Sequence, residues 1–287
     1  MKVFIANSSK QQVGGGWTWI RNFKKSMGDL ITENYDEADV YLIASPSMVQ
    51  RDEVELARQH GKRIVLRVDN AVRNSRNRNT GMTRMKDFAE WADLVVFQSN
   101  WAKEYLMPFL QIDENKTRVI LNSVDEDIFH PTPTQRIDYA TNYLYSRFNR
   151  DETKNWEVAR YWFSVTSPRQ LASKLFIVGN FSPELVEGNF DFYNNENYSY
   201  LGVLDEIGIS SVYKSCRNFI YTYFNDACSN SLIEALMCGC KIVGDKYYRT
   251  TGGAPEILDA FKKYGHSYFS LKRMADEYKE ALSGLIL

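Results

Sequence analysis

Long apolar runs, net charge, cysteine and histidine are all scarce in this sequence of 287 residues. The 35 basic and 36 acidic side chains leave a formal net charge of only -1, which gives a nucleic-acid partner no electrostatic footprint. No stretch of about 18 apolar residues occurs, so no transmembrane segment is predicted. The start MKVFIANSSK also lacks the apolar core of a signal peptide. We therefore expect a soluble, cytoplasmic protein, for which peripheral contact with a membrane stays open.

The few potential metal ligands do not have the spacing of a metal site. The cysteines crowd one region and are interpreted as reduced, mostly buried small hydrophobic residues, and the histidines are scattered: Cys216, Cys228, Cys238 and Cys240; His60, His130 and His266. The acidic stretch Asp125-Glu126-Asp127 follows an apolar run, and an acidic turn is the favoured interpretation. No metal is expected.

Near-continuous apolar runs alternate with helical segments along the whole chain. Such alternation predicts an α/β protein in which parallel sheets are covered by helices on both faces. The proline-containing HPTPTQR, residues 130 to 136, interrupts the alternation and is interpreted as a linker. We expect two Rossmann-like, doubly wound domains, 1–132 and 133–287, with the last helix free to pack back on the first domain. The apolar runs are 3–7, 38–44, 62–68, 93–99, 117–122, 143–148, 174–180, 199–203, 218–224 and 241–245.

Three glycines, Gly14, Gly15 and Gly16, lie between the first predicted strand and a helix. They do not spell G-x-G-x-x-G and no acid follows the second strand at the customary place, so no nicotinamide or flavin cofactor is expected. Either they form a flexible loop or they let the backbone approach a phosphate or sugar. The basic segment VRNSRNRN, which contains Arg73, is either a solvated loop or a grip on an anionic or polar acceptor.

The segment DACSNSLIEALMCGC, residues 226–240, has an acid on each side of a run of small residues. Ser231 and Glu234 have the spacing of a capping box, which is one interpretation. The other is an anion site, where backbone N–H groups at a helix start bind a phosphate, because small residues allow a close approach. Arg147 ends a predicted strand, and Lys154 follows after an acidic turn, just before a helix. The two could neutralise a diphosphate or be ordinary surface charges.

In their order along the chain, these segments resemble retaining glycosyltransferases of family 4, which have the GT-B fold of two Rossmann-like domains facing across a cleft. GGGWTWIRNF is similar to the glycine loop and first helix, and VFQSNWAKEYL and VILNSVDEDIFHP to the segments that close the first domain. YSRFNRDETKN is similar to the donor motif G-R-x4-K-G, and LFIVGN to the next strand. NDACSNSLIEALMCGCKIVGD with TTGGAPEIL resembles the E-x7-E block.

The resemblance implies that Glu234 holds the nucleotide ribose, that Asp226 lies beside the transferred sugar, and that Arg147 and Lys154 bind the diphosphate. Asp226, Arg147 and Lys154 are the candidate catalytic residues. The remaining candidates are a donor-binding set, the glycine loop and an acceptor side: Cys228, Ser229, Asn230, Ser231, Leu232 and Gly179; Gly14, Gly15 and Gly16; Asp69, Asn70 and Arg73.

Four positions depart from the family pattern. Asp226 replaces the usual glutamate, and Val68 stands where many relatives have a histidine. Ser123 and Asn155 each replace a glycine. The expected activity is a retaining, cofactor-free and metal-independent transfer from a nucleoside diphosphate sugar to a sugar, lipid-linked or protein acceptor. The alternatives are an inactive GT-B protein that binds a nucleotide or sugar, and a nucleotide-sugar epimerase or sugar phosphorylase.

Overall fold

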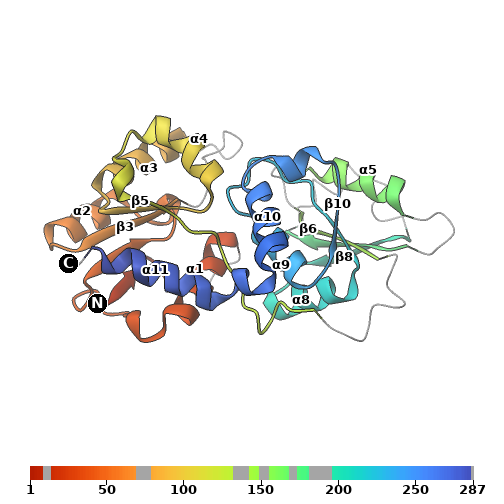
Figure 1. Ribbon diagram of the computed structural model, residues 1–287, viewed down its shortest axis with the longest axis horizontal. Coiled ribbons are helices and arrows are strands. Elements are labelled where there is room, and N and C mark those ends of the chain that lie inside the picture. Colours follow the sequence, from red (N-terminus) through yellow and green to blue (C-terminus); the bar gives the residue numbers. More distant parts are fainter. Residues whose placement is uncertain are drawn as a thin grey trace. The chain divides into compact units, whose positions relative to one another are not determined.

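The computed structural model describes residues 1–8, 14–68, 79–131, 142–148, 155–167, 173–180 and 196–285, and the chain divides into two compact units (Figure 1). Unit 1 contains Met1–Val124 and Glu256–Leu287, and unit 2 contains Asp125–Pro255. The chain passes from unit 1 to unit 2 after Val124, and the C-terminal segment Glu256–Leu287, with the last helix, belongs to unit 1. In the described parts of the chain, no helix combines the length and the apolar character that crossing a bilayer requires.

The sheet of unit 1 is entirely parallel, with neighbouring strands in the order β1-β2-β3-β4-β5. Consecutive carbonyl groups of β1 point to opposite edges: that of Lys2 accepts from Val40, and that of Val3 accepts from Thr32. The winding therefore reverses at β1, the strand that precedes the glycines. The strands are β1 (Val3–Ile5), β2 (Val40–Ile43), β3 (Arg63–Val68), β4 (Leu94–Phe97) and β5 (Thr117–Val119).

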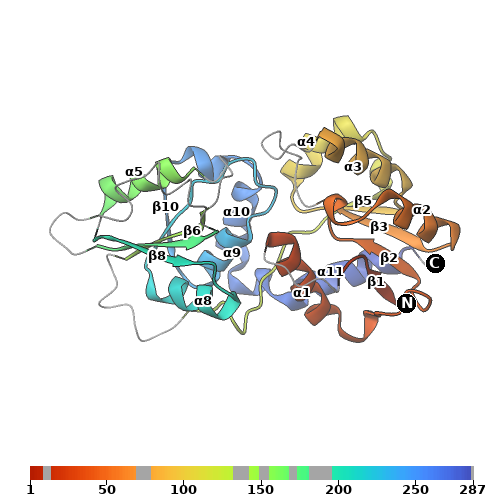
Figure 2. The same ribbon diagram turned by 180° about the vertical axis from the view of Figure 1, so that it is seen from behind.

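Helices cover both faces of this sheet, with α1 and α11 on one face and α2, α3 and α4 on the other (Figures 1 and 2). Ile20, Phe23 and Met27, whose spacing places them on one face of α1, are all buried. Phe23 packs edge-on against Tyr278 of α11, with ring centroids 4.9 Å apart. The helices are α1 (Gly15–Met27), α2 (Arg51–Gln59), α3 (Asn79–Trp91), α4 (Asn100–Leu110) and α11 (Leu271–Ser283).

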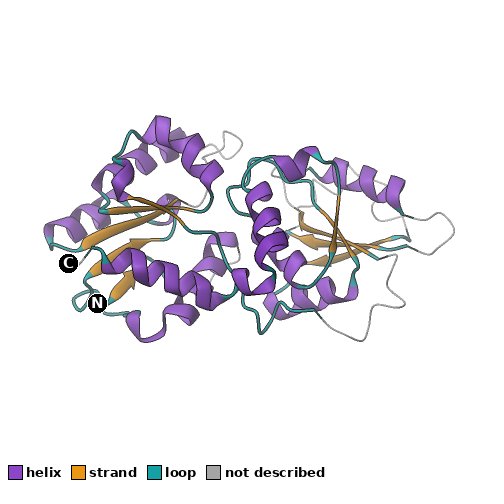
Figure 3. Ribbon diagram, in the orientation of Figure 1, coloured by secondary structure: helices purple, strands orange, loops and turns teal. Residues whose placement is uncertain are grey.

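Unit 2 has a second parallel sheet, in the order β8-β7-β6-β9-β10. The chain winds outwards from β6 through β7 to β8, and then returns to place β9 on the other side of β6. One face carries α5 and the other carries α8 and α9 (Figure 3). The elements are β6 (Tyr143–Phe148), α5 (Trp156–Thr166), β7 (Leu175–Gly179), β8 (Tyr198–Gly202), α8 (Glu206–Ser215), β9 (Asn218–Ile220), α9 (Asn230–Met237) and β10 (Lys241–Val243).

The predicted fold class is confirmed: both units are doubly wound α/β structures, and a described strand overlaps each of the ten predicted apolar runs. All four cysteines are buried thiols outside any disulfide, as expected from their spacing. Helix α10 (Ala254–Tyr264) begins in unit 2 and continues into unit 1, where the Glu256 carboxylate accepts hydrogen bonds from the N–H groups of Asn100 and Trp101, each at 2.8 Å.

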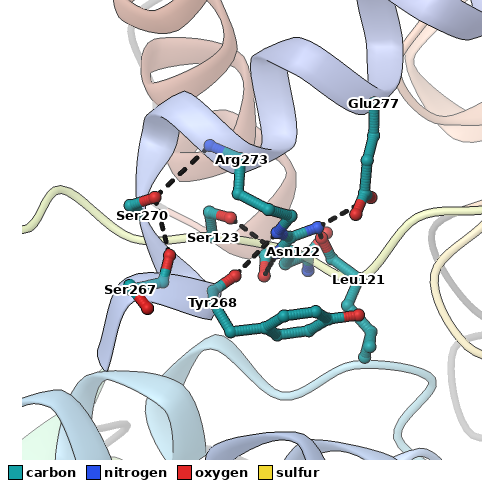
Figure 4. Close-up of polar contacts among 8 residues, drawn as sticks. All are labelled: Leu121, Asn122, Ser123, Ser267, Tyr268, Ser270, Arg273 and Glu277. Atoms are coloured by element: carbon teal, nitrogen blue, oxygen red, sulfur yellow. Dashed lines mark hydrogen bonds and ion pairs between the residues drawn. The ribbon is translucent and has the colours of Figure 1, made fainter. Parts of the chain in front are cut away.

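The return of the chain to unit 1 is fixed by one arginine on α11. Arg273 donates to the carbonyl groups of Leu121 and Asn122 at 2.9 and 3.1 Å, and to the Ser123 hydroxyl at 2.8 Å (Figure 4). It also donates to the Tyr268 carbonyl at 2.6 Å. The residues after β5 and the start of α11 are therefore held by a single guanidinium group.

We expect Arg273→Ala to lower the free energy of unfolding by about 3 kcal/mol, because several carbonyl groups lose a charged donor at once. Urea denaturation followed by circular dichroism measures this. The matched control is the neighbouring Lys272→Ala, whose side chain is 83% exposed and pairs with Asp276, and which should change stability by less than about 0.5 kcal/mol. Equal effects of the two substitutions would show that Arg273 is not the main tie.

Candidate functional site

The carboxyl ends of β6, β7 and β9 meet at one edge of the unit 2 sheet, because the three strands are parallel neighbours. The winding reverses between β6 and β9, and ligands of open α/β sheets bind outside such a reversal. Arg147 lies near the end of β6, and Gly179 ends β7, where its carbonyl accepts from the Tyr200 hydroxyl at 2.8 Å. The side chain of Arg147 and the whole of Lys154 lie outside the described residues, so their role stays a prediction.

The loop after β9 delivers Asp226 to this edge. Asn225 has a left-handed backbone with φ of 52°, and the next residue, Asp226, is only 7% exposed. The N–H of Gly253 donates to the Asp226 carbonyl at 2.9 Å. A Cβ atom on Gly252 would lie 2.5 Å from the same oxygen. Gly252 and Gly253, the two glycines of the TTGG stretch, therefore lie directly against the backbone of Asp226.

Helix α9 begins two residues earlier than a capping box at Ser231 requires. Ser229 is the N-cap, and its hydroxyl accepts from the Leu232 N–H at 3.4 Å. Ser231 is thus the second residue of the helix and Glu234 the fifth, so the capping-box interpretation of this pair is wrong. The predicted run of small residues around the helix start is buried throughout: Cys228, Ser229, Asn230, Ser231 and Leu232.

Glu234 faces a buried phenol on the neighbouring helix instead of capping its own. The Tyr213 hydroxyl of α8 lies 3.2 Å from the Glu234 Oε2 atom and 3.2 Å from the Ser231 carbonyl oxygen. Complete burial, and then the charge of Glu234, raise the pKa of Tyr213 well above its usual value. The phenol therefore keeps its hydrogen and acts as a donor. Tyr213 was not among the residues predicted from the sequence, where nothing links it to an acid 21 positions later.

The three consecutive glycines Gly14, Gly15 and Gly16 lie at the start of α1. Gly14 is the N-cap of α1 with φ of 143°, a backbone conformation that other residues rarely adopt. Gly15 and Gly16 are already the first two residues of the helix. A Cβ atom on Gly16 would lie 2.7 Å from the Met48 Cε atom, so a side chain there would require the flexible end of Met48 to move.

A buried polar network ties together the carboxyl ends of β2 to β5, and the sequence analysis did not predict it. Arg67 is 2% exposed and donates to the Ala44 carbonyl at 3.0 Å and to Asn122 Oδ1 at 3.2 Å. Asn122 in turn donates to Gln98 at 2.7 Å, and Gln98 donates to the Val68 carbonyl at 3.0 Å. The sequence feature that could have indicated this network is Arg67, a charged residue inside the apolar run RIVLRV.

The predicted acceptor-side residues, Asp69, Asn70 and Arg73, lie outside the described residues. The network nevertheless fixes the carbonyl of Val68, the residue that leads into them. The guanidinium group of Arg67 also lies 4.3 Å from the Trp19 ring of α1. The carboxyl edge of the unit 1 sheet, where β3 ends before these predicted residues, is therefore held by hydrogen bonds and by contact with α1.

The acidic stretch that starts at Asp125 forms a turn, as interpreted from the sequence. The Asp125 carboxylate accepts from the Asp127 N–H at 3.2 Å, and its carbonyl accepts from Ile128 and Phe129. Asp125 therefore uses a side-chain oxygen within its own turn. Over the described ranges, no group of three or more His, Cys, Asp or Glu residues is arranged to hold a metal ion.

No protein-family model and no curated protein matches this sequence. Solved structures do match: HepE of Anabaena, crystallised with UDP and glucose, has a TM-score of 0.76 at 12% identity, over 99% of this chain and 100% of its own. Sucrose-phosphate synthase of Thermosynechococcus elongatus has a TM-score of 0.70 at 14% identity, over 99% of both chains. A glycosyltransferase of Rickettsia africae has a TM-score of 0.60 at 14% identity, over 98% of both. The chain thus has the GT-B fold, as predicted.

We expect Gly252→Ala to lower the free energy of unfolding by about 2–4 kcal/mol, from left-handed strain and from the collision with the Asp226 carbonyl. Gly202→Ala is the matched control in the same unit, because its φ is 71° and the atom nearest to the new Cβ is 3.9 Å away. Gly202→Ala should lower the free energy of unfolding through left-handed strain only, by about 1–2 kcal/mol. Equal losses for the two variants, measured by urea denaturation, would mean that the turn does not press on Asp226.

Proposed function

We propose that the protein transfers a sugar from a nucleoside diphosphate sugar to an acceptor, with the donor bound at the β6 and β9 edge of unit 2. The observation that carries this proposal is the buried start of α9, where small residues lie between Asp226 and Glu234 at the reversal of the winding. The crystal structures of HepE, a protein of the same fold, contain UDP with glucose in one case and UDP-glucose in another. A nucleoside diphosphate sugar has the charge and the hydroxyl groups that this arrangement suits.

Each part of the donor is assigned to a different group. The diphosphate is assigned to the start of α9, where the positive end of the helix dipole favours an anion. Arg147 and Lys154 supply positive charge to the same group. Glu234 accepts hydrogen bonds from the ribose hydroxyls, and Asp226 lies beside the transferred sugar. The acceptor is assigned to unit 1, with the glycine loop, Asp69, Asn70 and Arg73 as the candidate residues.

The proposed reaction retains the configuration of the sugar. The bond from the anomeric carbon to the diphosphate oxygen breaks, the acceptor oxygen bonds to that carbon on the same face, and the acceptor proton passes to the leaving diphosphate. Negative charge develops on the diphosphate, where donors fixed in advance stabilise it most in the transition state. This chemistry needs no protein nucleophile and no cofactor.

The reaction is proposed to be independent of metal ions, because Arg147 and Lys154 take the place of a divalent cation on the diphosphate. The Asp125 carboxylate is also engaged within its own turn. Turnover of the donor should be the same with and without EDTA, as measured by release of the nucleoside diphosphate. Turnover that EDTA abolishes and that manganese or magnesium restores contradicts this proposal.

The two acids should respond differently to loss of charge. Glu234→Gln keeps the shape but weakens a charge-assisted contact to the ribose, so donor affinity should fall about tenfold. Asp226→Asn should lower kcat by on the order of 100-fold and donor affinity much less, because it acts where charge develops in the transition state. A thermal-shift screen identifies the donor, and calorimetry and steady-state turnover give the two effects.

Glu280→Gln, an exposed site on α11, is the control and should alter neither quantity. Both active-site variants should unfold within about 1 kcal/mol of the parent. Unchanged donor affinity in Glu234→Gln removes the ribose assignment. Donor binding without transfer or hydrolysis in the parent protein favours an inactive GT-B binding protein, the alternative raised by the shorter reach of Asp226.

A further inference from the structure

Three buried hydroxyl groups, those of Tyr223, Ser146 and Tyr213, form a hydrogen-bonded series that ends at Glu234. The Ser146 hydroxyl of β6 lies 3.1 Å from the Tyr223 hydroxyl and 3.3 Å from the Tyr213 hydroxyl. Tyr223 donates to the Ser146 carbonyl. Tyr213 in turn lies within hydrogen-bond distance of Glu234 Oε2 and the Ser231 carbonyl. This hydrogen-bonded series therefore links β6, the strand that carries Arg147, to Glu234, the acid proposed to hold the ribose.

The number of hydroxyl hydrogens decides which group donates to which in this hydrogen-bonded series. A phenol has a single hydrogen, and that of Tyr223 is used on the Ser146 carbonyl. The Ser146 hydroxyl is then left to donate to one of the two tyrosines. Tyr213 has two acceptors at the same distance, and an ionised carboxylate is the stronger one. Its hydrogen therefore goes to Glu234.

Tyr213 cannot follow Glu234 if that side chain moves, because the tyrosine is fixed on all sides. Its exposed fraction is 0%, and its ring packs edge-on against Phe219, with centroids 5.6 Å apart. The Cys240 thiol donates to the Tyr213 carbonyl at 3.3 Å and fixes its backbone. A glutamate side chain loses rotamer freedom when it is bound to such a partner before the ligand arrives, and preorganisation of this kind favours binding.

We propose that Tyr213 is the positioning residue for Glu234: it holds one carboxylate oxygen so that the carboxylate faces the ribose of a nucleoside diphosphate, and the Ser146 and Tyr223 hydroxyls keep Tyr213 in place. This inference rests on the proposed function, since it deepens the role of Glu234 there. The link through Ser146 also ties the ribose contact to the residue directly before Arg147, to which the diphosphate is assigned above.

The test compares Tyr213→Phe with the parent in calorimetric binding of UDP, GDP and their 2′,3′-dideoxy counterparts. The parent should prefer the ribose form on the order of tenfold, the size expected when a hydrogen bond to a charged group is lost. Tyr213→Phe should bind the ribose form roughly three- to tenfold more weakly and the dideoxy form as the parent does, so the preference falls to about threefold or less. Ser146→Ala, a smaller change, should reduce the preference in the same direction.

Tyr278→Phe, which removes the hydroxyl of a buried tyrosine in unit 1, is the control and should leave both affinities unchanged. In a Glu234→Ala background, Tyr213→Phe should have no further effect, which a general structural role would not produce. If the parent prefers the ribose form and both Tyr213→Phe and Ser146→Ala keep the full preference, the inference is overturned while the proposed function stands. A parent that binds neither UDP nor GDP contradicts the proposed function, and the inference falls with it.

Discussion

The reversal of winding between β6 and β9 is the constraint on which the candidate site depends. Parallel strands deliver the residues that follow them to one edge of the sheet, and at a reversal the two connections leave towards opposite faces. In unit 2 this brings together the end of β6, the loop that carries Asp226 and the start of α9. The end of β6 is far in the sequence from the other two segments, and the strand order brings all of them to one edge of the sheet.

Buried polar groups hold the carboxyl edges of both sheets. Burial of a polar or charged group costs free energy unless it is hydrogen-bonded, and networks of directed bonds at both edges offset much of this cost. In unit 1 the network runs from Arg67 through Asn122 to Gln98, and Arg273 holds the backbone of the same Asn122 from α11. In unit 2 it runs through hydroxyl groups to Glu234. Directional bonds fix positions more narrowly than apolar packing, which is what a binding edge requires.

The architecture could be predicted because buried parallel strands are near-continuous apolar runs, and ten of them stand out in this sequence. The start of α9 could not, because Ser229 and Ser231 both have a capping side chain and only the path of the chain after Asp226 selects the first. Tyr213 could not be found either, since its partner lies on another helix and no spacing rule joins them. Arg67 could have been suspected from its place in an apolar run, but its acceptors come from two other strand ends.

A crystal structure of the protein with bound UDP tests the central claim most directly. The account predicts the diphosphate against the N–H groups at the start of α9, with the ribose hydroxyls within hydrogen-bond distance of the Glu234 carboxylate and the Glu234–Tyr213 hydrogen bond kept. A nucleotide bound instead at the glycines of unit 1, or a ribose directed away from Glu234, would contradict it.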